Sequence, residues 1–512
     1  MVRNPLTSAR VPSLRIKHFL GLFLLLAPLS DPVTHAFQFE VVGIRPSAVP
    51  DAHRLPAVIQ PASAWSPPAE LVPSQQVSQA INATPVSSGF TAEQLAEIEQ
   101  MLAAYGARPR QTGSPSRFGY DNGFVLTSPS GVRIGTNDVP FALRINSWVQ
   151  LRHTLFDSHG PNPDQNDIEF ERVRLTFGGH AYTQDLKYYI QLDGDGDQGE
   201  LIDLLDYYFR YDLGHDQFGW KNGRLGIQAG KWKLPFNRTR AEAGWQLEFT
   251  DRSMASAFFD INRSQGASIF GSVEPFGKTV NFETAVFNGF QTEGALPGRS
   301  GELDRNLGCS TRIYSDLIGE WGTDGEPDLT SHDYLAMRVG SGFAYTRADA
   351  EGVREFRRQR VVDSGAILAS ILPAGVTAYD IFFYAADMNF KYQGLSFHSE
   401  YYFRALNNFA GAPVPGLFDH GFLLQTGYFI FPETLELAAR WSRINGDSGT
   451  LGVTNQSADE VAAAIIWYIR GHNAKLTFDA TYLNGAPLRD SALNILPGDA
   501  GWLFRTQLQL RF

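Results

Sequence analysis

Cysteine is almost absent from this chain of 512 residues, in which Cys309 is the single example. One cysteine excludes an internal disulfide, a paired redox motif and a metal site built from several thiolates. The chain has 43 Lys and Arg residues against 54 Asp and Glu residues, which gives a net charge of −11. A nucleic-acid partner requires a basic surface, so none is expected. We also expect no metal and no other cofactor.

Long apolar runs are equally scarce. The run from Phe19 to Leu29 follows Arg15 and Lys17 and precedes Thr34-His-Ala36, a small-x-small cleavage pattern. This arrangement predicts a secretory signal peptide over residues 1–36. No other segment approaches the roughly 20 apolar residues of a membrane-spanning helix. A membrane location would therefore require a β-barrel, which satisfies its own backbone hydrogen bonds.

The last eleven residues alternate between apolar and polar side chains, which a strand sends to opposite faces. One face carries Trp502, Phe504, Thr506, Leu508, Leu510 and Phe512, and the other carries Arg505, Gln507, Gln509 and Arg511 with Leu503. A terminal aromatic residue in such a strand resembles the closing strand of a bacterial outer-membrane β-barrel. The alternative is a half-buried edge strand of a soluble sheet.

Similar alternation continues upstream and predicts sixteen strands. An even number brings both ends of a bacterial single-chain barrel to the periplasmic side. The fold class expected for residues 141–512 is therefore all-β, a transmembrane antiparallel β-barrel. The predicted strands are 141–155, 168–181, 185–193, 201–212, 223–233, 266–274, 279–288, 334–346, 354–362, 379–392, 395–405, 421–430, 435–444, 459–470, 474–484 and 502–512.

The connections between these segments alternate in length. Counting back from the C-terminus, 485–501 is long, Gly471-His-Asn473 is short, 445–458 is long and Phe431-Pro-Glu-Thr434 is short. Barrels of this class join strands by short periplasmic turns and long external loops. A soluble sandwich or propeller has no reason to alternate in this way.

The charged face of each strand is expected to line a water-filled lumen. A basic side chain facing lipid at mid-membrane costs roughly 2–4 kcal/mol, which favours the inward orientation. The candidates for lining the pore and contacting anions are Arg144, Arg152, Arg172, Arg174 and Arg505.

The loop after the fifth predicted strand, about 234–265, is the third on the external side. Charged loops that narrow a pore select ions by sign. Bases and acids are balanced here, and they give no net preference. The constriction candidates are Arg238, Arg240, Arg252, Arg263, Glu242, Glu248, Asp251 and Asp260.

The N-terminal part of the mature chain has a different composition. Residues 37–90 are rich in Pro, Ala and Ser, which is typical of a linker, and we expect a periplasmic arm. Thr91-Ala-Glu-Gln94 resembles a capping box and begins a short amphipathic helix over 91–106. Residues 107–140 would connect this helix to the barrel.

Eight motifs are spread over the predicted barrel. They are Glu171-Arg-Val-Arg-Leu-Thr-Phe-Gly-Gly179, Leu205-Asp-Tyr-Tyr208, Gly226-Ile-Gln-Ala-Gly-Lys-Trp-Lys-Leu-Pro-Phe236, Thr250-Asp-Arg-Ser253, Val286-Phe-Asn-Gly289, Ser399-Glu-Tyr-Tyr-Phe-Arg404, Gly427-Tyr-Phe-Ile-Phe-Pro-Glu-Thr-Leu-Glu-Leu-Ala-Ala-Arg-Trp-Ser-Arg443 and Trp467-Tyr-Ile-Arg-Gly-His-Asn-Ala-Lys-Leu476. Together these motifs resemble the phosphate-selective porin O and P family. The resemblance implies an outer-membrane barrel of sixteen strands, usually a homotrimer, that passes small hydrophilic solutes or inorganic anions past lumen arginines and lysines. The third and fifth loops do not match the lysine-rich constriction of selective members, so a general or weakly anion-biased porin is preferred to a phosphate-selective one.

Three other readings remain open. Ser396, His398 and Glu400 share one strand face and offer the only local grouping for an outer-membrane hydrolase. The Pro-rich arm is compatible with a structural tether to the cell wall. The basic run Arg354, Arg357, Arg358 and Arg360 either draws anions toward the pore or forms a solvated rim. Asp193-Gly-Asp-Gly-Asp197 fails the helical calcium-loop pattern and indicates a turn.

Overall fold

The computed structural model describes residues 117–120, 123–134, 137–194, 202–290, 305–350, 356–357, 359–363, 365–446, 451 and 457–512. The expected signal peptide (1–36), arm (37–90) and helix (91–106) lie outside these ranges. Within them, no helix is both long enough and apolar enough to cross a membrane.

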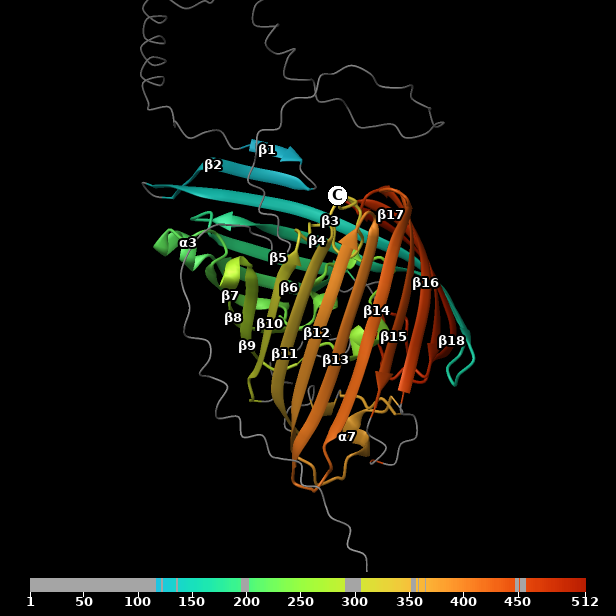
Figure 1. Ribbon diagram of the computed structural model, residues 1–512. Helices are drawn as coiled ribbons and strands as arrows, with labels where there is room; N and C mark the ends of the chain where they lie inside the picture. Colours follow the sequence, from blue (N-terminus) through green and yellow to red (C-terminus); the bar gives the residue numbers. More distant parts are fainter. Residues whose placement is uncertain are drawn as a thin grey trace, which may run out of the picture. The chain divides into compact units, whose positions relative to one another are not determined.

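Sixteen antiparallel strands, β3 to β18, form a closed barrel (Figure 1). Each strand pairs with its neighbours in sequence, and β18 closes the ring by pairing with β3. The strands are β3 (Asn137–Ser158), β4 (Gln165–Ala181), β5 (Leu186–Gly194), β6 (Ile202–Tyr211), β7 (Leu225–Lys233), β8 (Arg263–Val273), β9 (Val280–Phe287), β10 (Gly308–Ile318), β11 (Ala336–Asp349), β12 (Ala378–Tyr392), β13 (Leu395–Ala410), β14 (Leu417–Phe431), β15 (Leu435–Asn445), β16 (Ser457–Arg470), β17 (Ala474–Asn484) and β18 (Ala500–Arg511).

Two further strands precede the barrel within the segment expected to be a connector. β1 (Arg117–Tyr120) pairs with β2 (Phe124–Ile134), and β2 pairs with the first part of β3. The helices are short: α3 (Leu213–Phe218), α4 (Arg238–Ala241), α5 (Met254–Phe258) and α7 (Leu368–Ile371).

The predicted number of barrel strands is confirmed, but one predicted strand is wrong. Residues 354–362 form no strand in their described part, and the sixteenth strand is instead β10, which the sequence pattern did not predict. The outward face of β10 includes Cys309, Thr311 and Ser315, so its apolar pattern is weak. Val361 and Val362 are both buried, because they pack into the barrel interior instead of alternating.

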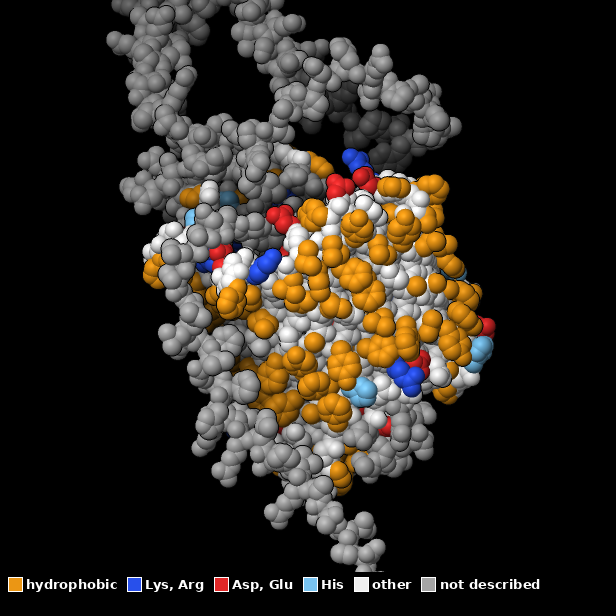
Figure 2. Space-filling view, in the orientation of Figure 1, with side chains coloured by type: hydrophobic (Ala, Val, Ile, Leu, Met, Phe, Trp, Pro, Cys, Tyr) orange, Lys and Arg blue, Asp and Glu red, His pale blue; other side chains and the backbone are white. Residues whose placement is uncertain are grey.

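The outer surface of the barrel is apolar, as a lipid-facing surface must be. Hydrophobic side chains cover the face over β11 to β16, shown in Figure 2. In β18, Trp502, Leu508 and Leu510 are exposed on this side, whereas Gln507 and Gln509 are buried inside. The predicted faces of the closing strand are therefore confirmed.

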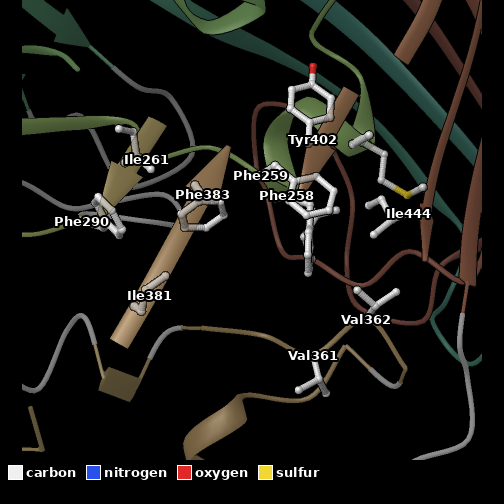
Figure 3. Packing of buried hydrophobic residues seen from close by; sticks show 14 of the residues in the cluster. Phe258, Phe259, Ile261, Phe290, Val361, Val362, Ile381, Phe383, Tyr402 and Ile444 are labelled. Carbon is white, nitrogen blue, oxygen red and sulfur yellow. The ribbon is translucent and has the colours of Figure 1, made fainter. Parts of the chain in front are cut away.

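The barrel also encloses a hydrophobic cluster, although the alternating charged faces predict a water-filled lumen. Phe383 of β12 and Tyr402 of β13 point inward and pack with Phe259 and Phe290 from two loops (Figure 3). Val361 belongs to the same cluster. Fully burying such a side chain stabilises by roughly 1.5–3 kcal/mol, so this packing holds the loops inside the barrel.

Two ends of the barrel can be distinguished by their connections. The turn end carries the short connections 393–394, 432–434 and 471–473, and β18 ends there. The loop end carries the connections 234–262, 350–377 and 485–499. The expected alternation of lengths fails at two long connections of the turn end, residues 212–224 between β6 and β7 and residues 319–335 between β10 and β11.

Candidate functional site: the lumen and its inner loop

Residues 234–262, between β7 and β8, fold into the lumen and are called the inner loop below. The loop contains α4, capped by the Asn237 side chain, and α5, capped by the Ser253 side chain. Helices this short are unstable alone, so contacts with the barrel wall must hold the loop in place. The inner loop is the third connection at the loop end, as the sequence predicted.

Carboxylates of the wall accept hydrogen bonds from the backbone of the inner loop. Glu400 of β13 accepts from the N–H of Arg238 at 2.7 Å and from that of Thr239 at 3.2 Å. Asp479 of β17 accepts from the N–H of Thr250 at 3.2 Å. Unpaired N–H groups at the start of a helix favour an anionic partner, and the Glu400 carboxylate is this partner for α4. Glu400 therefore fixes the loop.

Arginines of the wall also hold the inner loop. Arg152 of β3 and Arg172 of β4 converge on the Asp251 carboxylate, with Arg152 Nη2 3.3 Å from Asp251 Oδ2. Arg152 also pairs with Glu171 at 3.0 Å. Burial by itself would raise the pKa of Asp251, but Arg172, Arg152 and a third guanidinium outweigh it and keep this pKa well below 3.8. Asp251 is thus an anionic anchor at neutral pH.

The structure pairs four of the five expected anion-contact residues with carboxylates. Arg152 and Arg172 bind Asp251, Arg505 lies 3.0 Å from Asp479, and Arg174 lies 2.8 Å from Asp193. The Arg505 side chain is only 2% exposed, against 13% for Arg174. Arg152, Arg172 and Arg505 therefore act as anchors in this arrangement.

Arg144 lies on the inward face of β3, opposite Gly178 of β4. It shares this face with Arg152, and the outward residues Leu151 and Leu155 are exposed on the other side. The inward orientation that the sequence predicted for β3 is thus confirmed.

The expected constriction residues are also paired with groups of opposite charge or with polar groups. Arg240 lies 2.9 Å from Asp260, and Arg263 of β8 lies 2.7 Å from Asp206 of β6. Arg238 lies 3.5 Å from Glu242, and Gln425 donates to Glu248 at 2.8 Å. Arg252 donates to the Glu242 carbonyl at 2.7 Å.

Two charged groups of the inner loop have shifted pKa values. Burial and the nearby Arg240 guanidinium lower the pKa of Arg252 to about 9, which leaves it charged at neutral pH. Burial would raise the pKa of Glu242, but Arg238 and Arg338 outweigh this effect and lower it. Both groups therefore carry charge inside the barrel under ordinary conditions.

Water reaches only part of the lumen. The side chains of Arg240, Arg338 and Asp316 are 18%, 15% and 30% exposed. In contrast, Asp479 of β17 and Arg505 of β18 are at most 2% exposed. The accessible part thus lies along β4, β5, β10, β11 and one edge of the inner loop. Its charged groups include three pairs, Arg174–Asp193, Arg240–Asp260 and Arg338–Asp316.

The proposed hydrolase grouping does not form a nucleophile–base pair. Ser396 donates its hydroxyl hydrogen to Glu248, and His398 Nε2 donates to the Glu326 carbonyl at 2.9 Å. Both side chains are almost fully buried. Across the described ranges, no group of three or more His, Cys, Asp or Glu side chains is placed to hold a metal ion.

Two sequence motifs are only partly visible. Asp193 ends β5 and pairs with Arg174, while the other two aspartates of its motif lie outside the described residues. In the basic run, Arg354 and Arg358 also lie outside, and Arg360 donates to the Gly365 carbonyl at 2.7 Å.

Comparisons with known proteins place this fold beside solved outer-membrane channels. No family model matches the chain, and no curated protein matches it in sequence. The outer membrane channel DcaP of Acinetobacter baumannii is 9% identical with a TM-score of 0.47, over 75% of this chain and 100% of that one. An anion-selective porin from Comamonas acidovorans is 10% identical with a TM-score of 0.45, over 72% and 99%. OmpF of Salmonella typhi, in complex with daunomycin, is 12% identical with a TM-score of 0.45, over 77% and 100%. At these values the likeness carries no argument about function, and membership of the phosphate-selective porin O and P family stays a prediction.

Proposed function

We propose that the protein is an outer-membrane porin that allows passive diffusion of small hydrophilic solutes. The observation that carries this proposal is the combination of an apolar outer surface with charged, partly water-accessible side chains inside a closed barrel. Lipid can contact the outside, and water and solutes can occupy the inside. The turn end would face the periplasm and the loop end the exterior.

The solute path follows the accessible part of the lumen, beside the inner loop. Arg174, Arg240 and Arg338 lie along it, each within ion-pair distance of an aspartate. Paired charges orient and slow ions of both signs, so they do not create the strong field of an unpaired basic constriction. Lys187 and Arg210 lie opposite one another on β5 and β6, so two basic side chains face the same part of the lumen near the turn end. We therefore propose a weak anion preference without a dedicated phosphate site.

Reversal potentials in a KCl gradient test this preference. Purified protein is inserted into a planar bilayer with unequal KCl concentrations on the two sides. A small reversal potential with the sign of chloride preference is expected. A cation preference would contradict the proposed sign, and an addition of millimolar phosphate that blocks the chloride current would contradict the absence of a phosphate site.

Assembly as a homotrimer is proposed from the family resemblance alone. Chemical crosslinking followed by a native gel provides the test, because a trimer and a monomer differ threefold in mass. Migration as a monomer in mild detergent and in crosslinked membranes would contradict the proposal.

A further inference from the structure

Residues 319–335, between β10 and β11, enter the lumen from the turn end and are called the inner turn below. Turns at this end of such barrels are normally short, because they only need to reverse the chain. Trp321, Glu326 and Asp328 of the inner turn are at most 3% exposed, although the segment lies outside the strands. Their burial requires that the inner turn is packed inside the barrel.

The inner turn crosses the lumen and contacts the far wall. Lys391 of β12 donates to the Gly325 carbonyl at 2.8 Å, and His398 of β13 donates to the Glu326 carbonyl at 2.9 Å. His472, in the connection between β16 and β17, donates to the Asp324 carbonyl at 2.8 Å. Leu329 packs against the cluster that contains Phe429 and Ile466. The turn thus leaves β10 and β11 and reaches β14 and β16.

Three side chains therefore hold the backbone of the inner turn through its carbonyl groups. Burial and the nearby Lys475 ammonium lower the pKa of His472 to about 3, so this imidazole is neutral at neutral pH. A neutral His472 can donate its single Nε2 proton to the Asp324 carbonyl. Separating a buried carbonyl group from its hydrogen-bond donor leaves both groups unpaired, which costs free energy.

The inner turn also meets the inner loop inside the barrel. Gln246 donates to the Thr323 carbonyl at 3.0 Å, and the N–H of Glu248 donates to Glu326 at 3.0 Å. The side-chain amide of Gln425 lies between Glu248 and Glu326 and donates to both, at 2.8 and 2.9 Å. The loop from one end and the turn from the other are thus joined at mid-lumen.

We propose that the inner turn is a second constriction element, which closes the β12–β17 side of the lumen from the periplasmic end and confines solutes to the side lined by β4, β5, β10 and β11. The inference rests on the proposed porin function. Trp321 marks the boundary between the two sides, since its ring lies 4.7 Å from Lys391 Nζ and 5.4 Å from the Arg338 guanidinium carbon. Arg338 belongs to the accessible side and Lys391 is buried.

The experiment compares the unitary conductance of the wild-type chain and three variants in planar bilayers. In the first variant, residues 322–331 are replaced by two glycines, which removes the part of the inner turn that crosses the lumen. In the second, Glu326→Ala removes the acceptor shared by Glu248 and Gln425. The control shortens another long connection at the turn end, residues 212–224, where Phe218 and Trp220 are exposed. The wild-type protein is the reference.

We expect the shortened inner turn to raise unitary conductance several-fold and Glu326→Ala to raise it less, with added current fluctuation. The control should conduct like the wild type. Wild-type conductance in a properly inserted shortened variant would overturn the inference. If that variant does not fold, unchanged conductance and noise in Glu326→Ala would overturn it. If the wild type does not conduct and the shortened variant does, the inner turn closes the lumen, which supports this inference. The same result would contradict the proposal that solutes diffuse freely through the native protein.

Discussion

Replacing Asp251 by asparagine tests how strongly the wall holds the inner loop. Asp251 is 1% exposed and pairs with both Arg152 and Arg172. The Asp251→Asn change removes the carboxylate and leaves the two guanidinium groups buried close together. Breaking a buried ion pair by removing one partner costs about 3–5 kcal/mol. The barrel ladders are untouched, so we expect this cost to fall on the attachment of the loop.

A loss of this size changes the ratio of attached to detached loop by about two to four orders of magnitude, since 1.36 kcal/mol is tenfold. Single-channel recordings should then show new conductance levels, and added protease should cut the inner loop. Asp316→Asn is the matched control, because its pair with Arg338 is 30% exposed on the aspartate side. Partly exposed pairs contribute about 0–1 kcal/mol, so this control should keep the protease resistance of the wild type and show no new conductance levels, although its ion preference can change. Quiet wild-type current and full protease resistance in Asp251→Asn would refute the reasoning.

Three further predictions follow from the same contacts. Deletion of Phe512 removes two backbone hydrogen bonds to Ser147, of 2.7 and 2.9 Å. The amount of heat-modifiable, membrane-inserted protein should fall sharply, while any channel that does assemble should conduct normally. Unchanged assembly would contradict the pairing of Phe512 with β3. Because the pKa of Asp251 is lowered in the folded protein, its stabilising effect is fully present above pH 3.8 and is lost as the pH falls further. The difference in current noise between Asp251→Asn and the wild type should therefore stay constant from neutral pH down to about pH 4.5 and shrink only in stronger acid, and a loss of this difference near pH 6 would contradict the assignment. Arg174→Gln leaves Asp193 without its ion-pair partner on the accessible side, so the reversal potential should move toward cation preference, whereas the same change at buried Arg505 should shift it less.

Alternation of side chains was sufficient to predict the closed barrel. The closing strand illustrates the reason: a one-residue shift would place Gln507 and Gln509 in lipid and Leu508 in the lumen. β10 escaped the prediction because Cys309, Thr311 and Ser315 on its outer face contribute little hydrophobic contrast. The strand count remained correct only because 354–362 was predicted in its place.

The interior of the barrel was less predictable than its wall. The alternation of side chains along each strand predicted that Arg152 and Arg505 face inward. This alternation cannot distinguish a basic residue that contacts solutes from one that is bound to a carboxylate. Tertiary contacts decide this for Arg152, because Asp251 lies 99 residues away in sequence, whereas Asp479 lies directly opposite Arg505 on the neighbouring strand. One available signal was β12, where Ile381, Phe383 and Ala385 make the inward face apolar and indicate a packed interior. The inner turn had no comparable local signal.

Solute uptake by proteoliposomes tests the central claim most directly. Purified protein is reconstituted into vesicles, and osmotic swelling is followed with a monosaccharide, a disaccharide and a trisaccharide. Passive diffusion through a lumen narrowed by the inner loop and the inner turn predicts swelling that falls steeply with sugar size. Heat-modifiable, correctly inserted protein that admits no monosaccharide would contradict the assignment of this barrel as a porin.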